Sequence, residues 1–105
     1  MTLEQFRDVL LGITTKAYHY EAQGETTQEH IIWQETGKRA LYGDDMRSVT
    51  VWEIQVDIYT KEEYSALPEM VMLALEEADI ACEDPVITYE SETGLTRYTI
   101  ECEVI

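Results

Sequence analysis

One stretch decides the fold of this chain: Trp52-Glu53-Ile54-Gln55-Val56-Asp57-Ile58-Tyr59-Thr60-Lys61. Its apolar and polar side chains alternate with a period of two, which is typical of a β-strand with one buried face and one polar face. The alternation predicts a long strand over about residues 49–60, which ends where the chain becomes polar at 60–63. The side chains expected to face a core are Trp52, Ile54, Val56 and Ile58, and those expected to face away from it are Glu53, Gln55, Asp57 and Tyr59.

Shorter elements precede and follow this strand. Thr2 and Gln5 form a capping-box pattern, which predicts the start of a helix over about 3–12, and Pro68 suits the first turn of a second helix over about 67–80. Two strand-like runs around a short loop with glycine predict a C-terminal β-hairpin. The other expected strands are 14–21, 30–35, a short irregular one at 38–41, and the two hairpin strands 85–90 and 96–104.

These elements predict an α+β fold in the order α-β-β-β-α-β-β, with a single, mostly antiparallel sheet and two helices. At 105 residues, the chain is expected to be a single domain, 1–105. In the last strand, Tyr98, Ile100, Cys102 and Val104 are expected to point inward, and Arg97, Thr99, Glu101 and Glu103 outward.

The second helix is apolar over much of its circumference. Such a helix is buried on more than one side, which has two explanations: it forms a subunit interface, or it is sunk between the sheet and the loops. Leu67, Val71, Ala74, Leu75 and Ala78 line one face, and Met70, Met72 and Leu73 widen it.

The charge of the chain restricts its partners. With 22 acidic and 7 basic residues, the formal net charge is −15. Duplex DNA and anionic membranes bind through Lys and Arg, so sequence-specific nucleic-acid binding and membrane binding are not expected. The acidity fits a basic partner, a DNA mimic, a surface past which nucleic acid slides without sticking, or a requirement for solubility alone.

The sequence offers no recognisable catalytic or cofactor site. His19 and His30 could form a metal site or an acid–base pair with nearby glutamates, but they do not fit a metal-binding pattern, so structural roles are favoured. Cys82 and Cys102 have no metal-ligand spacing, and a reduced, intracellular setting is the simplest expectation. No signal peptide or membrane-spanning run is present in the sequence. The chain is therefore expected to be a cytoplasmic protein without catalytic activity, cofactor or metal.

Several segments, taken in order, resemble a family of small proteins encoded in the tail-and-connector gene block of long-tailed bacteriophages and prophages. They are YHY at 18–20, IIWQE at 31–35, LYGDD at 41–45, QVDIYTK at 55–61, YESETG at 89–94, and Tyr98. The resemblance covers nearly the whole chain and implies a tail terminator, or tail completion protein. Such proteins form a ring, typically of six subunits, which caps the tail tube and joins it to the head connector. Related small proteins of the same gene block include head–tail joining and minor capsid components, and the resemblance does not separate them from a terminator.

Two hypotheses follow from different classes of function. The first is a virion-assembly protein that partners with itself, the tail tube and the head connector in a bacterial host. The second is an acidic inhibitor or DNA mimic, encoded by a mobile element, that binds a basic host protein; acidic side chains clustered on one surface would favour it. For the first, interface residues are expected on strand edges, on the second helix and in the loops 22–28 and 42–48. The candidates are Tyr18, Tyr20, Trp33, Asp57, Tyr59, Met70, Met72 and Leu73.

Overall fold

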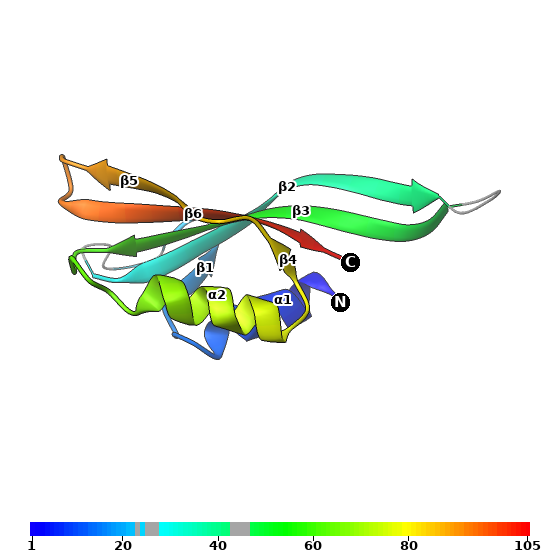
Figure 1. The fold of residues 1–105 in the computed structure, drawn as a ribbon, viewed down its shortest axis with the longest axis horizontal. Helices are drawn as coiled ribbons and strands as arrows, with labels where there is room; N and C mark the ends of the chain where they lie inside the picture. The colour runs from blue at the N-terminus through cyan, green and yellow to red at the C-terminus, as the bar shows by residue number, and fades with distance from the viewer. Residues whose placement is uncertain (23, 25–27, 43–46) are drawn as a thin grey trace.

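The computed structural model describes residues 1–22, 24, 28–42 and 47–105, except for the side chains at 41, 42, 47 and 48. The predicted α+β class and the order of the helices and main strands are confirmed, and a two-residue strand, β4, is added (Figure 1). The elements are α1 (Leu3–Leu11), β1 (Ala17–His19), β2 (His30–Tyr42), β3 (Arg47–Thr60), α2 (Leu67–Glu77), β4 (Ala81–Cys82), β5 (Val86–Glu90) and β6 (Leu95–Val104).

The described strands form one sheet in the order β1-β2-β3-β6-β4, and β5 also pairs with β6. β3 lies between β2 and β6 and is antiparallel to both, as are β4 and β5 to β6. The short β1 is parallel to β2, so the sheet is mixed rather than purely antiparallel.

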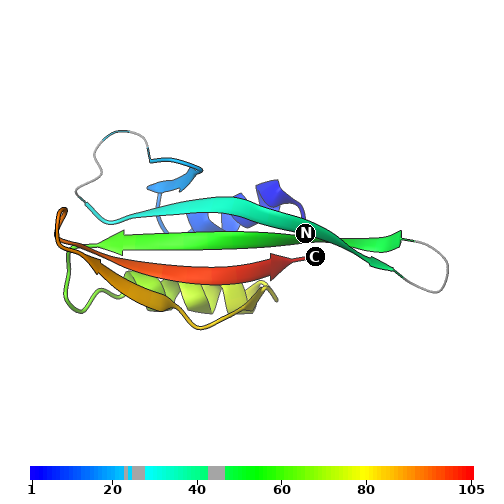
Figure 2. The same cartoon turned by 90° about the horizontal axis from the view of Figure 1, so that it is seen from above.

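Both described helices lie against one face of the sheet and leave the other face open (Figure 1). Viewed from the open face, α1 lies behind β2 and α2 behind β6 and β5 (Figure 2). The core between the two layers contains Phe6 and Leu10 of α1, Leu67, Val71 and Leu75 of α2, and the inward side chains of the three central strands. Those strand residues are Ile31, Trp33, Ile54, Val56, Ile58, Ile100, Cys102 and Val104.

The period-two pattern of β3 sets the core face of the sheet. Ile54, Val56 and Ile58 are all fully buried, as predicted. Trp52 is half-buried and packs against the margin of the core. Asp57 lies in the outward phase, as predicted, yet only 6% of it is exposed. Neighbouring side chains cover its carboxylate on the open face, which a single-strand pattern does not reveal.

The predicted end of the second strand at Thr36-Gly37 is wrong, because β2 continues to Tyr42. The pairing register between β2 and β3 shifts between Glu35 and Gly37, as in a β-bulge. A Cβ atom on Gly37 would lie 3.1 Å from Oε2 of Glu53, so a larger residue here would require the Glu53 side chain to shift. The β-bulge accommodates Thr36-Gly37 within the strand, so β2 continues beyond these residues.

Beyond the bulge, β2 and β3 form a projecting ribbon. The pairing of β3 with β6 stops at Trp52, whereas its pairing with β2 continues to the pair Tyr42–Arg47. Residues 39–42 and 47–51, called the arm below, therefore extend past the helices at one end of the molecule (Figures 1 and 2). The molecule is accordingly elongated, at 51 × 23 × 23 Å.

Positive φ angles end two elements earlier than predicted. The first strand, expected over 14–21, is reduced to Ala17–His19, and Tyr20 follows with φ 71°. The second helix ends at Glu77 instead of 80, and Asp79 has φ 58°. Neither extended nor right-handed helical backbone continues through such a residue. At the N-terminus, the predicted capping box between Thr2 and Gln5 is confirmed.

Candidate assembly surface

The clearest unpartnered surface is the strand β5, called the β5 edge (Val86–Glu90) below. Among the described residues, β5 pairs only with β6. Its apolar side chains are unusually accessible, with Val86, Ile87 and Tyr89 being 66%, 61% and 65% exposed. An exposed apolar strand edge is a template for pairing with another chain, so the β5 edge is a candidate contact between subunits.

A second exposed apolar area lies on α2. Leu67, Val71 and Leu75 face the core, as predicted. Met70 and Leu73, however, are 49% and 52% exposed, so the sheet and the described loops do not bury them. The circumference of α2 is therefore more apolar than packing within this one chain requires.

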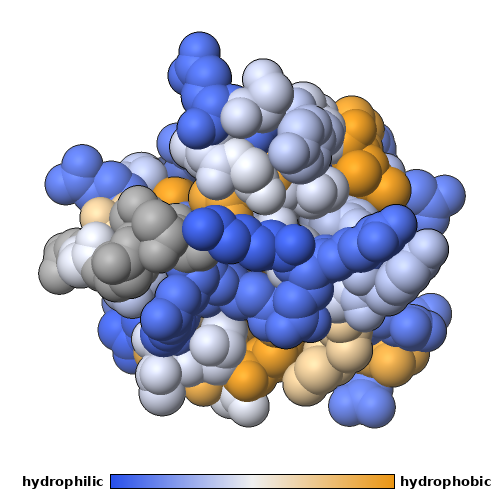
Figure 3. Space-filling view, turned by 90° about the vertical axis from the view of Figure 1, so that its left-hand side faces the viewer, coloured by the Kyte–Doolittle hydropathy of each residue, from blue (hydrophilic) through white to orange (hydrophobic). Residues whose placement is uncertain are grey.

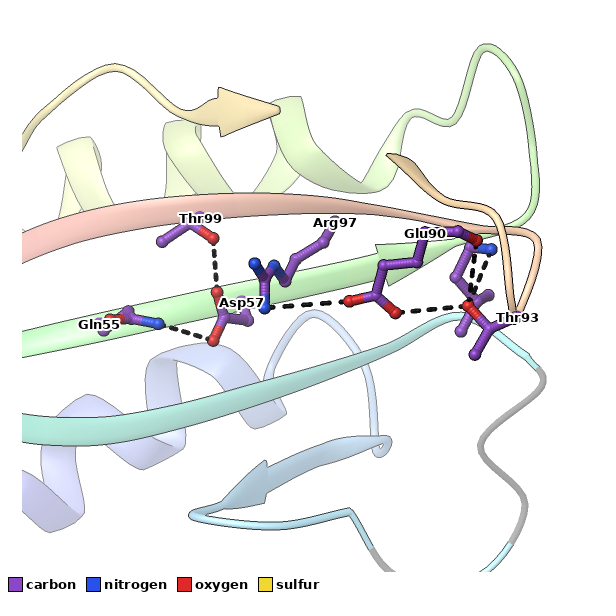
Figure 4. Close-up of polar contacts among 7 residues, drawn as sticks. Gln55, Asp57, Glu90, Thr93, Arg97 and Thr99 are labelled. Carbon is purple, nitrogen blue, oxygen red and sulfur yellow. Dashed lines mark hydrogen bonds and ion pairs between the residues drawn. The ribbon is translucent and has the colours of Figure 1, made fainter. Parts of the chain in front are cut away.

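A row of polar side chains crosses the open face of the sheet (Figure 4). The carboxylate of Asp57 accepts a hydrogen bond from the Thr99 hydroxyl at 2.6 Å and another from the Gln55 amide at 2.9 Å. Arg97 lies beside them, 3.9 Å from the Glu90 carboxylate. These contacts link β3 and β6 to the end of β5 and explain why a buried aspartate is tolerated.

Arg97 is held by several groups on the same face. Its hydrogen bond with Tyr59 raises its pKa above the ordinary value, although burial opposes this, and the charges of Asp57 and Glu90 add to the increase. The Tyr59 ring in turn stacks on His30, with centroids 4.8 Å apart. Tyr59 thus contacts both Arg97 of this polar row and His30 of β2.

A cluster around His19 joins β1 to β2. The His19 ring stacks on Trp33 at 4.0 Å and on Tyr20 at 3.8 Å, and its Nε2 atom lies 2.8 Å from Oε2 of Glu35. Burial by itself raises the pKa of Glu35, but hydrogen bonds with Tyr20 and His19 outweigh it and leave the pKa below its ordinary value. The hydrogen bond to Glu35 also raises the pKa of the Tyr20 hydroxyl.

We expect the cluster to weaken in acid. A carboxyl group whose pKa is lowered by folding stabilises the protein above its unfolded-state pKa, and that stabilisation is lost as the pH falls through the folded-state pKa. At pH 7, Glu35→Gln should therefore be less stable than wild type by about 1 kcal/mol, and the difference should shrink below about pH 5. Urea unfolding of both proteins from pH 7 to pH 3 measures this. A difference that stays constant over this range would contradict the assignment.

Acidic side chains line a shallow hollow beside β4. The hollow has a volume of about 300 Å³, and Glu53, Glu83, Glu101 and Glu103 border it together with both cysteines. Burial raises the pKa of Glu101, and the neighbouring charges of Glu83, Asp57 and Glu53 raise it further. We call this feature the acidic hollow; it gives the molecule one locally concentrated negative surface.

The two histidines have separate partners. His30 is buried, and its Nδ1 atom lies 2.7 Å from the backbone oxygen of Gln28. Among the described residues, no group of three or more His, Cys, Asp or Glu side chains is arranged to hold a metal ion.

Among the helices that the structure describes, none has the length and apolar character needed to cross a bilayer.

The predicted interface residues fall into three groups by exposure. Tyr20, Met70 and Leu73 are exposed, and Tyr18, Tyr59 and Met72 are half-buried. Trp33 and Asp57 are 2% and 6% exposed, so in this single chain they are too buried to contact another subunit directly. Alternation along the strand expected over 14–21 would place Tyr18 and Tyr20 on one face. β1 ends at His19 and Tyr20 has a positive φ, so that alternation does not extend to Tyr20. The loop predictions at 22–28 and 42–48 fall largely outside the described residues.

The apolar side chains of the β5 edge were missed as interface candidates. The run VITY at 86–89 is apolar on both faces, whereas an edge strand with one solvated face should alternate. That lack of alternation was the available signal. The end of the molecule that contains the β5–β6 turn is otherwise largely hydrophilic, with smaller hydrophobic areas around it (Figure 3).

No protein-family model matches this chain, and no curated protein matches it. A chain in a solved structure described as the virion of a native gene transfer agent (GTA) particle has a similar fold, with a TM-score of 0.63. The match covers 90% of this chain and 81% of that chain, at 9% sequence identity. At this level of identity, the likeness establishes a shared fold.

Proposed function

We propose that this protein is a structural component of a phage-like virion and acts as a tail terminator. In this role, it forms a ring, typically of six subunits, that caps the tail tube and joins it to the head connector. The fold likeness to a chain in a gene transfer agent virion, over 90% of this chain, is the observation that carries the proposal. The ordered sequence segments that resemble tail terminators support it independently.

The surfaces of the molecule suit a head-to-tail contact between subunits. A ring requires two different patches that meet, one from each neighbour. The β5 edge and the arm lie at opposite ends of the molecule, and each is a strand edge (Figure 1). We infer that the arm of one subunit lies against the β5 edge of the next.

Charge supports this pairing of surfaces. Lys38 lies at the base of the arm, and Arg39 is the first residue of the arm, where its guanidinium already pairs with Glu103 of the same chain at 2.9 Å. The β5 edge is bounded by Glu83 and Asp84 before it and by Glu92 after it, all of which are exposed. The charge of Lys38 would attract these carboxylates and help to orient the contact.

The acidity of the chain also predicts how assembly depends on salt. Six subunits with a net charge of −15 would bring a charge of −90 together, so repulsion opposes ring formation at low ionic strength. Light scattering at about 0.05 M and about 0.5 M salt should show a species of six subunits that increases with salt. A monomer at both concentrations would contradict spontaneous ring formation.

Ile87→Lys tests the β5 edge directly. A charge placed in an apolar contact loses hydration without gaining a partner, so we expect association to weaken at least about tenfold. The matched control is Ser91→Lys in the adjoining turn, where the side chain is also exposed. Both variants make the chain less acidic to the same extent, which by itself favours association. A loss of association confined to Ile87→Lys therefore cannot come from the change in net charge. Equal association of both variants would exclude the β5 edge.

The acidic hollow keeps the inhibitor or DNA-mimic hypothesis as a second candidate. Four carboxylates border that hollow, as expected for a surface that binds a basic protein. Acidic residues also occupy α1, α2 and the β5–β6 turn, however, and this distribution over several surfaces favours the assembly role. Two results together would favour the mimic. The protein would remain a monomer, and it would bind a basic host protein specifically, with binding lost in Glu101→Gln/Glu103→Gln.

A further inference from the structure

The two cysteines face each other across neighbouring strands. Cys82 of β4 is directly opposite Cys102 of β6 in the pairing register. Their Sγ atoms are 3.4 Å apart, and both thiols are free. A disulfide bond requires about 2.0 Å between sulfur atoms, so a shift of roughly 1.4 Å would close the bond.

The strand that carries Cys82 is weakly held. β4 has only two residues, Ala81 and Cys82, paired with β6, and the Glu83 N–H extends this pairing by donating to the Glu101 oxygen at 2.9 Å. It connects the end of α2 to the start of β5. A covalent bond here would fix the position of the segment that leads into the β5 edge.

We propose that Cys82 and Cys102 are an oxidisable pair that closes into a cross-strand disulfide when the protein meets a disulfide oxidant. Closure would tie β4 to β6 and stabilise the fold. A virion protein passes from a reducing cell interior to an oxidising exterior, so the bond would form after release; this consequence alone rests on the function proposed above.

The two thiols differ in a way that assigns their roles. The hydrogen bond with Cys102 lowers the pKa of Cys82, although burial and the charge of Glu76 oppose the decrease. The same hydrogen bond and burial raise the pKa of Cys102. Cys82 is also the more accessible of the two. Cys82 is therefore the attacking sulfur, and Cys102 resolves the intermediate.

The reaction with cystamine, a small cationic disulfide, shows the balance of atoms. The Cys82 thiolate attacks one sulfur of cystamine, the S–S bond of the reagent breaks, and one cysteamine leaves and takes up a proton. Cys102 then loses its proton and attacks Sγ of Cys82, which releases the second cysteamine. The protein loses two hydrogens, and cystamine is reduced to two cysteamines.

Acidic side chains next to Cys82 should select the oxidant by charge. Cys82 lies on the core face of the sheet, in a hollow that it shares with Met72, Glu76, Ile80 and Asp84. The two carboxylates attract cationic reagents and repel anionic ones. Cystamine should therefore react at least about tenfold faster than anionic glutathione disulfide at low salt, and the ratio should fall at about 0.5 M salt. Equal rates at low salt would overturn this charge selection.

The experiment treats the purified chain with cystamine and follows intact mass, free thiols and thermal unfolding. We expect a monomer that has lost two hydrogens, with no alkylatable thiol. Its Tm should rise by about 10 °C, because the bond closes a loop between residues 20 positions apart. A stable cysteamine adduct, cross-linked dimers or an unchanged Tm would each overturn the proposal.

Cys82→Ala is the control variant, because its half-buried site should tolerate the smaller side chain. Treated in the same way, it should show no rise in Tm. A rise equal to that of wild type would show that the stabilisation does not come from the disulfide and would overturn the proposal. The assay needs neither ring nor tail tube, so its outcome is independent of whether the protein is a tail terminator.

Discussion

Phe6→Ala should remove about 3–5 kcal/mol from the free energy of unfolding. Phe6 is fully buried, and its ring lies 5.3 Å from that of Trp33, so it joins α1 to the central strands. Truncation removes the ring and leaves a cavity that the sheet cannot close. Because domains of this size are stable by only about 5–15 kcal/mol, the variant should unfold at a much lower urea concentration.

Two further variants make the Phe6 result specific. Phe6→Leu keeps most of the apolar volume and should lose less than about 1.5 kcal/mol. Leu11→Ala, at a partly exposed position near the end of the same helix, should change stability by less than about 0.5 kcal/mol. A Phe6→Ala protein within about 1 kcal/mol of wild type would mean that α1 does not pack against the sheet as described here.

Asp57→Ala should lower the stability of the isolated chain by about 2 kcal/mol. The change leaves the Thr99 hydroxyl and the Gln55 amide without the carboxylate to which they donate, on a covered part of the open face. Buried polar groups without partners lose their hydration and gain nothing in return. Urea unfolding of the monomer at pH 7 measures this loss.

A double-mutant cycle separates the hydrogen bond from the loss of the side chain. Thr99→Val removes the donor while keeping the shape, so Asp57→Ala/Thr99→Val should be less destabilised than the sum of the single variants, by about 1 kcal/mol. Asp57 was also predicted as an interface residue. If its only role were between subunits, Asp57→Ala would weaken association and leave the stability of the monomer unchanged.

Most of the secondary structure could be predicted from local patterns. The alternation in β3, the capping box at Thr2 and Gln5 and the C-terminal hairpin each depend on neighbouring residues, and each is confirmed. The errors arose where a distant contact overrides the local signal. Thr36-Gly37 resembles a strand end, but its pairing with β3 converts it into a bulge within one long strand.

The candidate surface was less predictable for the same reason. Sequence patterns identified Met70 and Leu73 as surplus apolar residues on α2, and both are exposed. They did not identify the β5 edge, because exposure of Val86 and Ile87 depends on whether another strand or helix covers β5. They also did not bring Cys82 and Cys102 together, since two residues far apart in sequence become neighbours only through the β4–β6 register.

The sequence by itself determined the α+β class, the core faces of β3 and β6 and the strongly acidic charge. These properties follow from periodicity and composition, which are local. Only the tertiary structure decided that Asp57 is buried, that β2 and β3 extend into an arm, that β5 is an uncovered edge and that the two thiols face each other. Each of these depends on strand order and register, which are set by the packing of the whole chain.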